Sequence, residues 1–221
     1  MFDEPLSHLD ADQKVYLRSE IKRLQQSIGL TSVLVTHDQT EAVAMSDKVA
    51  VMNYGVLEQV GTPGELYERP ANLFVANFIG EPPMNLLPVE LSRQSQRLHV
   101  AGQGWSLRLN EMQSRRLDQY VGNFAITLGI RPEHLSVSPS GVTPQDLSDE
   151  QGLMSGKVFF RELRGDTEVL TVIIDDSKPA SSVVVEIDGP STIRAGDKLS
   201  LTMSADLICI FETDSGINLL L

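Results

Sequence analysis

Two adjacent carboxylates, Asp3 and Glu4, follow a short apolar stretch early in the sequence. Carboxylate oxygens are ligands that Mg²⁺ prefers in proteins, and a second carboxylate beside the metal can orient and deprotonate a water molecule. Acidic residues are also common on protein surfaces, where they do no chemistry. The pair alone therefore leaves two interpretations, a site for metal-assisted hydrolysis and a solvated acidic turn.

Three further polar residues bear on the choice between these two interpretations. Ser7 and Asp10 stand in LSHLDA, directly after the acidic pair, and His37 follows the apolar run SVLV by one residue. An imidazole at a strand end can donate a hydrogen bond to negative charge that develops during a reaction. Taken alone, His37 fits a structural histidine better than a catalytic one, so its interpretation depends on the pattern around it.

The elements that carry these residues alternate between helix and strand over residues 1–80. The helical spacing of apolar residues begins after Asp10 or Asp12, either of which can cap the helix, and Gly29 ends it. The expected elements are a helix at 10–29, a strand at 31–37, a helix at 38–47 and two strands joined by a turn within 48–61. The apolar run at 31–37 does not alternate, which predicts a strand buried on both faces. This order of elements predicts a parallel sheet covered by helices.

From Glu81 the pattern changes to short, β-branched stretches separated by Gly, Pro, Asp and Ser. Residues 81–90, which include EPPMNLLP, are rich in proline and predict a linker. Strands are expected within 91–221 at 125–130, 155–163, 168–174, 182–187, 197–203 and 207–211. Their regular turn signals predict a small all-β barrel or sandwich.

The composition argues against several other classes of protein. The net charge of −12 repels phosphate backbones, and aromatic residues for base stacking make up only 5% of the chain, so nucleic acid is not an expected partner. The single cysteine, Cys209, excludes an internal disulfide and lies in the run LICIF, where a buried small hydrophobe is expected. No apolar run approaches the roughly 18 residues of a membrane-spanning helix.

Taken together, FDEPLSHLDA and the later LVTHDQTEA resemble the ATPases of ABC transporters, in the family's order and each on the expected element. By this resemblance Asp3 is the Walker B aspartate that holds Mg²⁺ at the nucleotide, and Glu4 is the catalytic glutamate. Ser7 and Asp10, within SHLD, match the D-loop that approaches the nucleotide across a dimer interface. His37 matches the switch histidine that contacts the γ-phosphate.

Further stretches narrow the resemblance. GTPGELYERPANLFVANFIGEPPMNLLP is similar to the end of the nucleotide-binding domain in importers of the maltose and glycerol-3-phosphate type. ITLGIRPEHL and GDKLSLTMSADLICIFETDSG resemble the regulatory domain of the same importers, an OB-like β-barrel known as TOBE. The resemblance implies an α/β remnant of a P-loop NTPase domain at residues 1–80, a linker at 81–90 and an all-β OB-like (TOBE) barrel at 91–221.

The phosphate-binding loop of the family, G-x-x-x-x-G-K-[ST], has no counterpart in this sequence. The nearest string runs from Gly152 to Val158; it has three residues between its glycines instead of four, and Val158 stands where a hydroxyl group is needed. The signature LSGGQ and the Q-loop, which precede Walker B in the family, are also missing. We therefore expect a C-terminal fragment that alone neither binds ATP tightly nor hydrolyses it, with ATP and Mg²⁺ as cofactors of the complete protein.

The resemblance also implies partners and a place in the cell. The expected partners are a second copy of the chain in a homodimer, the transmembrane permease subunits of a sugar importer and a regulator protein. The permease would hold the chain at the cytoplasmic face of the membrane. Strands of residues 1–80 that are left uncovered would expose an apolar surface, which favours self-association. The alternative is a non-catalytic module whose β domain binds an effector or regulator protein, beside a vestigial ATPase segment.

Overall fold

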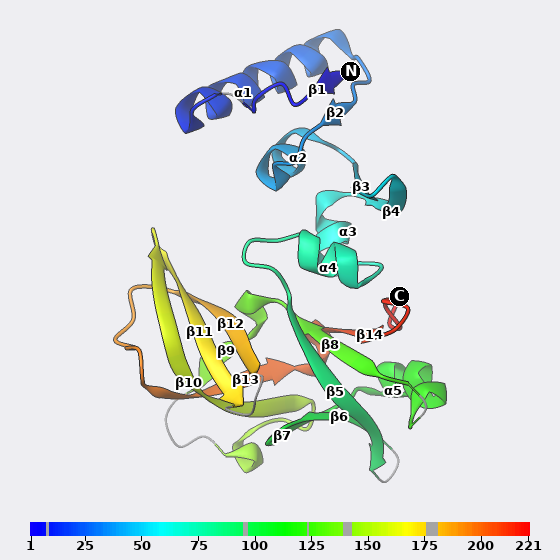
Figure 1. Ribbon diagram of the computed structural model, residues 1–221, viewed down its shortest axis with the longest axis vertical. Coiled ribbons are helices and arrows are strands. Elements are labelled where there is room, and N and C mark those ends of the chain that lie inside the picture. Colours follow the sequence, from blue (N-terminus) through cyan, green and yellow to red (C-terminus); the bar gives the residue numbers. More distant parts are fainter. Residues whose placement is uncertain (8, 95–96, 123, 139–142, 176–180) are drawn as a thin grey trace. The chain divides into compact units, whose positions relative to one another are not determined.

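The computed structural model describes residues 1–221 apart from 8, 95–96, 123, 139–142 and 176–180. The chain divides into two compact units, Met1–Pro70 and Ala71–Leu221, and each has its own organisation (Figure 1). Among the helices of the described residues, none combines the length and the apolar character that crossing a membrane requires.

The unit Met1–Pro70 begins with a parallel β-α-β arrangement. Its elements are β1 (Phe2–Asp3), α1 (Ala11–Ile28), β2 (Leu34–Val35), α2 (Gln39–Met45), β3 (Val49–Asn53), β4 (Val56–Gly61) and α3 (Pro63–Glu68). β1 and β2 pair in parallel, whereas β3 and β4 form an antiparallel hairpin. The expected order of helices and strands is confirmed, and the parallel pairing among the described residues is confined to two short strands.

Capping residues define both ends of α1. The carboxylate of Asp10 accepts a hydrogen bond from the backbone N–H of Gln13 at 2.9 Å, which satisfies one of the N–H groups left free at a helix start. Gly29 follows the last turn with a φ of 70°, a left-handed conformation that a residue without Cβ adopts readily. Of the two expected caps, Asp10 is the one that the structure uses, while Asp12 lies in the first turn.

The expectation of a strand at 31–37 buried on both faces is wrong. β2 covers only Leu34 and Val35, and neither side chain is buried. Val33 is 58% exposed and Val35 is 45% exposed, because the sheet that contains β2 has only β1 as a second strand among the described residues. The expected exposure of apolar strand residues is thereby confirmed.

The unit Ala71–Leu221 consists mainly of antiparallel strands. The helix α4 (Leu73–Phe78) precedes them, and α5 (Glu111–Leu117) lies between the third and the fourth of these strands. The strands are β5 (Asn85–Gln94), β6 (Arg97–Gly102), β7 (Trp105–Arg108), β8 (Ile126–Ile130), β9 (Ser136–Ser138), β10 (Gln151–Arg164), β11 (Thr167–Asp175), β12 (Ser181–Asp188), β13 (Lys198–Ser204) and β14 (Ile208–Glu212). Four 3-10 turns complete the described elements: η1 (Asp118–Tyr120), η2 (Pro132–His134), η3 (Pro144–Asp146) and η4 (Ala205–Leu207).

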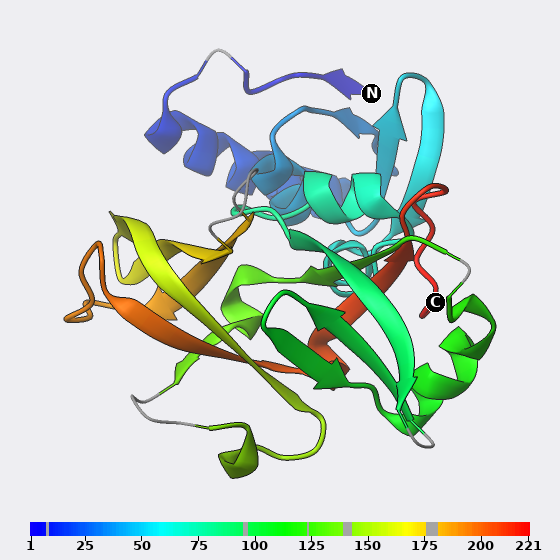
Figure 2. The same cartoon turned by 60° about the horizontal axis from the view of Figure 1, so that its bottom comes forward.

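Two five-stranded sheets make up this unit, in the orders β14-β8-β5-β6-β7 and β12-β11-β10-β13-β9 (Figure 2). Two long strands change partner along their length. β5 pairs with β8 through Val89 and with β6 from Glu90, and β10 passes from β13 to β11 at Lys157. A strand that serves two partners in turn lets a sheet curve toward closure, as in small barrels. The expected β-barrel-like domain is confirmed.

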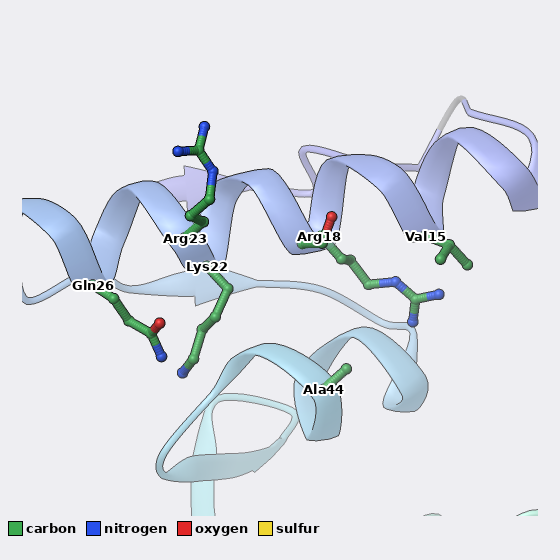
Figure 3. Close-up of a pocket in the computed structure, with 7 residues that line it drawn as sticks. Val15, Arg18, Lys22, Arg23, Gln26 and Ala44 are labelled. Carbon is green, nitrogen blue, oxygen red and sulfur yellow. The ribbon is translucent and has the colours of Figure 1, made fainter.

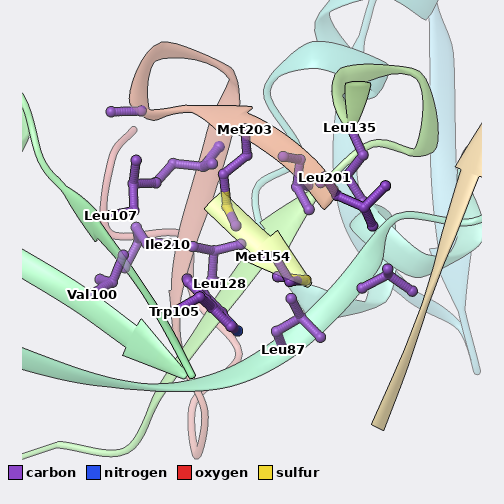
Figure 4. Packing of buried hydrophobic residues seen from close by; sticks show 14 of the residues in the cluster. Leu87, Val100, Trp105, Leu107, Leu128, Leu135, Met154, Leu201, Met203 and Ile210 are labelled. Atoms are coloured by element: carbon purple, nitrogen blue, oxygen red, sulfur yellow. The ribbon is translucent and has the colours of Figure 1, made fainter. Parts of the chain in front are cut away.

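Side chains from both sheets meet in one hydrophobic core (Figure 4). Leu128 and Ile210 enter it from the first sheet, and Met154 and Leu201 enter it from the second; all four are inaccessible to solvent. Trp105, at the start of β7, is buried in the same cluster. Removing apolar surface from water stabilises the folded state by roughly 25 cal/mol per Å². This unit therefore has a core of its own.

Two stretches have a different place in the structure from the one expected. Residues 85–90, expected within a linker, form the first part of β5, where Pro88 lies inside the strand. Residues 71–80, expected with the N-terminal segment, belong to the second unit, and the N–H of Leu73 donates to the carbonyl oxygen of Gly216 at 2.8 Å. The proline-rich composition of residues 81–90 indicates a linker. Their apolar side chains nevertheless pack in the unit Ala71–Leu221, which is called the β-rich unit below.

The string Gly152–Val158, the nearest match in the sequence to a phosphate-binding loop, is part of β10. It pairs with β13 in regular antiparallel register up to Lys157. A phosphate loop turns successive backbone N–H groups toward one point, whereas a paired strand directs them alternately to its two sides. The string is therefore a paired strand and not a phosphate-binding loop.

Candidate functional site

The acidic pair and His37 lie at the same end of the parallel strands β1 and β2: Asp3 is the last residue of β1, Glu4 follows it, and His37 lies two residues beyond β2. In the register of this pair Asp3 lies opposite Val35, and the N–H of Glu4 donates to the carbonyl oxygen of Val35 at 2.8 Å. The carboxyl ends of parallel strands share one edge of a sheet, which is where ligands bind in open α/β folds. Residues from two separate sequence motifs thus lie at the same edge of the sheet.

Glu4 and His37 are in direct contact. The Oε1 atom of Glu4 lies 3.0 Å from Nδ1 of His37. An ionised carboxylate only accepts hydrogen bonds, so Nδ1 carries the proton in this contact. The two side chains are 48% and 72% exposed, so both are accessible to a ligand. The contact leaves Nε2 as the ring nitrogen of His37 that a ligand can engage.

The backbone of Glu4 adopts an unusual conformation. Its φ of 42° lies in the left-handed region, which costs a residue with a side chain of the order of 1–3 kcal/mol and is most common at functional sites. The hydroxyl of Ser7 donates to the carbonyl oxygen of Glu4 at 3.0 Å, and the N–H of Ser7 donates to the same oxygen at 3.3 Å. Ser7 therefore stabilises the turn that presents Glu4, while its predicted contact with nucleotide stays a prediction.

Asp3 lies beside this pair with an exposed side chain. Within the described residues its carboxylate has no hydrogen bond or ion pair, and the same residues contain no cluster of three or more His, Cys, Asp or Glu that could hold a metal by itself. Mg²⁺ is commonly bound by one or two protein carboxylates, with water and substrate phosphates completing its ligands. A single free carboxylate such as that of Asp3 fits this requirement, and its role as a metal ligand stays a prediction.

Asp10 is engaged in a local contact. Its carboxylate caps α1 through the N–H of Gln13, and nothing in the described residues brings it to Glu4 or His37. His8, which lies between Ser7 and Asp10 in the predicted D-loop, is outside the described residues. The predicted approach of Asp10 to nucleotide therefore stays a prediction, and its observed role is structural.

Sequence reasoning missed a charged network beside His37. Nζ of Lys14, on α1, lies 3.1 Å from Oδ2 of Asp38 and 3.0 Å from Oε1 of Glu41. Glu41 is only 2% exposed, and a buried carboxylate is strongly destabilising without a charged partner. The hydrogen bonds to Glu41 and then to Asp38 raise the pKa of the Lys14 ammonium above its usual range, so it is charged at neutral pH.

Thr36 completes this network. Its hydroxyl donates to Oε2 of Glu41 at 2.7 Å and accepts from the N–H of Asp38 at 3.0 Å. Asp38 in turn caps α2 by accepting from the N–H of Thr40 at 2.9 Å. Burial raises the pKa of Asp38, but the bonds from Lys14 and from backbone N–H groups outweigh burial and lower it overall. The segment around His37 is therefore fixed by side chains on both of its flanks.

A shallow groove of about 550 Å³ lies between α1 and α2 (Figure 3). Its lining residues are Val15, Arg18, Ser19, Lys22, Arg23, Gln26 and Ala44. Nζ of Lys22 donates to the carbonyl oxygen of Met45 at 2.9 Å and lies 3.1 Å from Oδ1 of Asp47. Arg23 pairs with Glu20 at 2.8 Å. Nε of Arg18 donates to the carbonyl oxygen of Lys14 at 3.3 Å. Because all three cations have partners, the groove is better described as a seam between two helices than as an anion site.

Two ionisable groups of the β-rich unit have strongly shifted pKa values. Glu168, on β11, is inaccessible to solvent; its hydrogen bonds with Arg161 and then with Ser191 lower its pKa to about 2. Burial raises the pKa of the Cys209 thiol to about 11, against the opposing charge of Arg131. The first is a structural ion pair and the second is an inert thiol. The expected burial of Cys209 is confirmed.

Comparison with known proteins adds independent findings. Residues 80–135 match the family described as the MalK OB fold domain. The xylose/arabinose import ATP-binding protein XacK of Haloferax volcanii is 38% identical over 216 residues, which cover 98% of this chain and 53% of that protein. The sn-glycerol-3-phosphate import ATP-binding protein UgpC of Cupriavidus necator is 35% identical over 226 residues, covering 98% and 56%. UgpC of Vibrio cholerae is 50% identical over 140 residues, covering 63% and 35%.

The chain thus spans about half the length of the curated relatives it matches along nearly all of its own length. These relatives include an ABC transporter ATP-binding protein of Sinorhizobium fredii, 38% identical over 216 residues. The resemblance to importers of the maltose and glycerol-3-phosphate type is confirmed. Along 98% of its length the chain is similar to ATP-binding proteins of sugar and glycerol-3-phosphate importers, and residues 80–135 match the MalK OB fold domain.

Proposed function

We propose that the chain is the C-terminal portion of the ATP-hydrolysing subunit of an ABC importer, with Asp3, Glu4 and His37 at the edge of the hydrolysis site. The observation that carries this proposal is the contact of 3.0 Å between Glu4 and His37, because two distant motifs supply a carboxylate and an imidazole to one sheet edge. Relatives that cover nearly the whole chain are ATP-binding proteins for import. By analogy with them, the transported solute is a sugar or a related compound.

The arrangement suits the activation of water. The carboxylate of Glu4 is half exposed and oriented by the ring of His37, so it can accept a proton from a water molecule that attacks a phosphate. Since Nδ1 of His37 donates to Glu4, Nε2 is left for a phosphate oxygen and donates to it when the ring carries both protons. Mg²⁺ bound with the nucleotide would neutralise negative charge on the phosphates, and Asp3 is the residue that would hold it.

The cradle for the phosphates is not encoded in this sequence, which contains no G-x-x-x-x-G-K-[ST] string. In P-loop proteins the backbone N–H groups and the lysine of that string provide much of the phosphate binding. The chain by itself is therefore expected to bind ATP weakly and not to hydrolyse it. Calorimetric titration of the chain with ATP and Mg²⁺ tests this statement, and tight binding would contradict it.

A chimaera tests the catalytic assignment directly. The half of the Haloferax volcanii protein that this chain does not match is joined ahead of Met1, and ATP turnover is measured with and without Glu4→Gln and His37→Ala. Each substitution is expected to lower kcat about 10²–10⁴-fold, the range for loss of a general acid–base group. Asp47→Asn, at an 86% exposed acid beyond the other end of α2, is the control and should leave kcat unchanged. An active chimaera that does not respond to Glu4→Gln contradicts the assignment.

We further propose that the chain acts as a homodimer bound to transmembrane permease subunits at the cytoplasmic face of the membrane. Support comes from exposed apolar side chains, which mark interaction surfaces when they are grouped. Such groups are Val33 and Val35 at β2, and Phe159, Phe160 and Leu163 on β10. Light scattering checks self-association of the chain, and a clean monomer at high concentration contradicts the homodimer.

The second candidate function is a non-catalytic module in which the β-rich unit binds an effector or regulator protein. The observation that favours it is the separate core of that unit, which closes around Met154 and Leu201 without any residue of Met1–Pro70. A chimaera that stays inactive, although the relative from which it was built is active, supports this candidate.

A further inference from the structure

Two lysines of α1 hold the two ends of α2. Lys14 contacts the N-terminal end, where its Nζ lies 3.1 Å from Asp38 and 3.0 Å from Glu41. Lys22 contacts the C-terminal end, where its Nζ lies 3.1 Å from Asp47. Of these two contacts among the described residues, the one made by Lys14 adjoins the segment that carries His37.

The contact at Lys14 continues to both neighbours of His37 through hydrogen bonds. Oε1 of Glu41 faces Lys14, while Oε2 accepts from the hydroxyl of Thr36 at 2.7 Å. The N–H of Asp38 donates to that same hydroxyl at 3.0 Å. Thr36 and Asp38 flank His37 in the chain. The ring of His37 is 72% exposed and has little packing of its own, so the backbone on its two sides sets its position.

We propose that Lys14 is a positioning residue for the Glu4–His37 pair. By holding Asp38 and Glu41, its ammonium fixes the segment on either side of His37, and with it the place of the ring beside Glu4. Lys14 touches none of the reacting groups and acts through the two acids. Without it, the buried carboxylate of Glu41 would lack its charged partner, and the segment would have to move to expose that carboxylate to water.

This inference rests on the proposed function, because it concerns the same pair, but the geometry can be tested without ATP. The nitrogen shifts of the His37 ring in the full chain, recorded at a pH where the ring is neutral, distinguish a proton on Nδ1 from a proton on Nε2. The contact with Glu4 requires the proton on Nδ1. Glu4→Ala removes the acceptor. The nitrogen shifts that the parent chain shows and Glu4→Ala loses are therefore the signature of the contact.

Lys14→Met is expected to lose this signature to the same extent as Glu4→Ala, whereas Lys14→Arg retains it because the charge is kept. Lys22→Met is the matched control, since Lys22 lies on the same helix and holds the other end of α2. It should retain the signature, whatever stability it loses. Retention in Lys14→Met, or an equal loss in Lys22→Met, overturns the proposal.

A second variant covers the case in which Lys14→Met does not fold. Thr36→Val removes the hydroxyl that links Glu41 to Asp38 while every charge stays in place. Loss of the signature in this variant supports the proposal, and retention overturns it. A ring that does not respond to Glu4→Ala has a different meaning: the Glu4–His37 contact is then absent in solution, and the proposed hydrolysis site fails together with this inference.

Discussion

The Oε1 atom of Glu4 lies 3.0 Å from Nδ1 of His37, although 33 residues separate the two in the sequence. The contact exists because β1 and β2 run in parallel, so that the residues after each strand meet at the same edge. Parallel strands need a crossover between them, and α1 provides it. A catalytic role for either residue depends on this helix as much as on the two motifs.

Replacing Asp10 with alanine should destabilise the crossover helix α1. The carboxylate of Asp10 accepts from the N–H of Gln13, and loss of such a cap typically costs about 1 kcal/mol. Urea denaturation followed by far-ultraviolet circular dichroism should show a lower midpoint for the helical signal. Asp12→Ala is the matched control, because Asp12 lies in the first turn but is not the cap. Equal losses in the two variants would assign the effect to the helix dipole instead of the capping bond.

Local signals in the sequence predicted the parts of the site that depend on neighbouring residues. Asp10 and Gly29 mark the ends of α1 by their types alone, and the structure uses both. Glu4 and His37 could be placed at one edge because each follows an apolar run in a strand–helix–strand order. Lys14 could not be found in this way, since its partner Asp38 lies 24 residues away, at the cap of another helix.

Burial was the less predictable property. Within 31–37, residues 33–35 are apolar without alternation, which indicates a strand covered on both faces, yet Val33 and Val35 are exposed. The sequence of a strand shows whether its faces are apolar. It does not show whether another layer of the structure covers them. In the β-rich unit, alternating apolar residues predicted the strands around Leu128 and Leu201 correctly, because both sheets lie in the same chain and cover each other.

Arg131→Met should destabilise the β-rich unit by about 1.5–3 kcal/mol, the range for hydrogen bonds that involve a charged group. The guanidinium of Arg131 is buried and donates to the carbonyl oxygens of Ala76, at 3.2 Å, and Ile79, at the end of α4. Those carbonyl groups would then be left buried without this donor. Urea denaturation measures the loss, and hydrogen exchange should become faster in α4.

A matched control for this variant is Arg116→Met. Arg116 also donates to a backbone carbonyl oxygen, that of Leu220, but the interaction is exposed to solvent. Its loss should change the free energy of unfolding by no more than about 0.5 kcal/mol. Equal effects of the two variants would show that burial of Arg131 contributes nothing to its role.

The ion pair of Glu168 should make the β-rich unit less stable in acid. Hydrogen bonds from Arg161 and then from Ser191 lower the pKa of Glu168 from 4.5 to about 2 in the folded chain. Because the folded state holds the proton less tightly than the unfolded chain, the stabilisation is complete above about pH 4.5 and is lost as the pH falls toward about 2. Urea midpoints measured from pH 6 to pH 2 should fall across this window.

Glu168→Gln tests the cause of that fall. The variant should be less stable at neutral pH and should show a flatter dependence on pH between about 4.5 and 2. Glu162→Gln is the control, because Glu162 also pairs with an arginine, Arg164, at 3.1 Å but is exposed. A pH dependence that persists unchanged in Glu168→Gln would assign acid sensitivity to other carboxylates.

β10 has no room for a side chain at Gly156. A Cβ atom there would lie 2.5 Å from Cγ1 of Val172 and 2.8 Å from the backbone oxygen of Ile173. That oxygen belongs to the neighbouring strand β11, which cannot shift without disturbing its pairing with β10. Gly156→Ala should therefore destabilise the unit by about 1–3 kcal/mol, the range for overpacking. Ser155→Ala, at the exposed position beside it, should stay within about 0.5 kcal/mol of the parent chain.

The same pair of variants separates packing from ligand binding. Gly156 belongs to the string that most resembles a phosphate-binding loop, but this string is a paired strand, so its glycine should serve packing alone. Calorimetric titration with ATP and Mg²⁺ should then give the same result for Gly156→Ala as for the parent chain, once both are shown to be folded. A variant that keeps its stability but differs in ATP binding would contradict the packing role, because a substitution in a tightly packed strand must lower stability first.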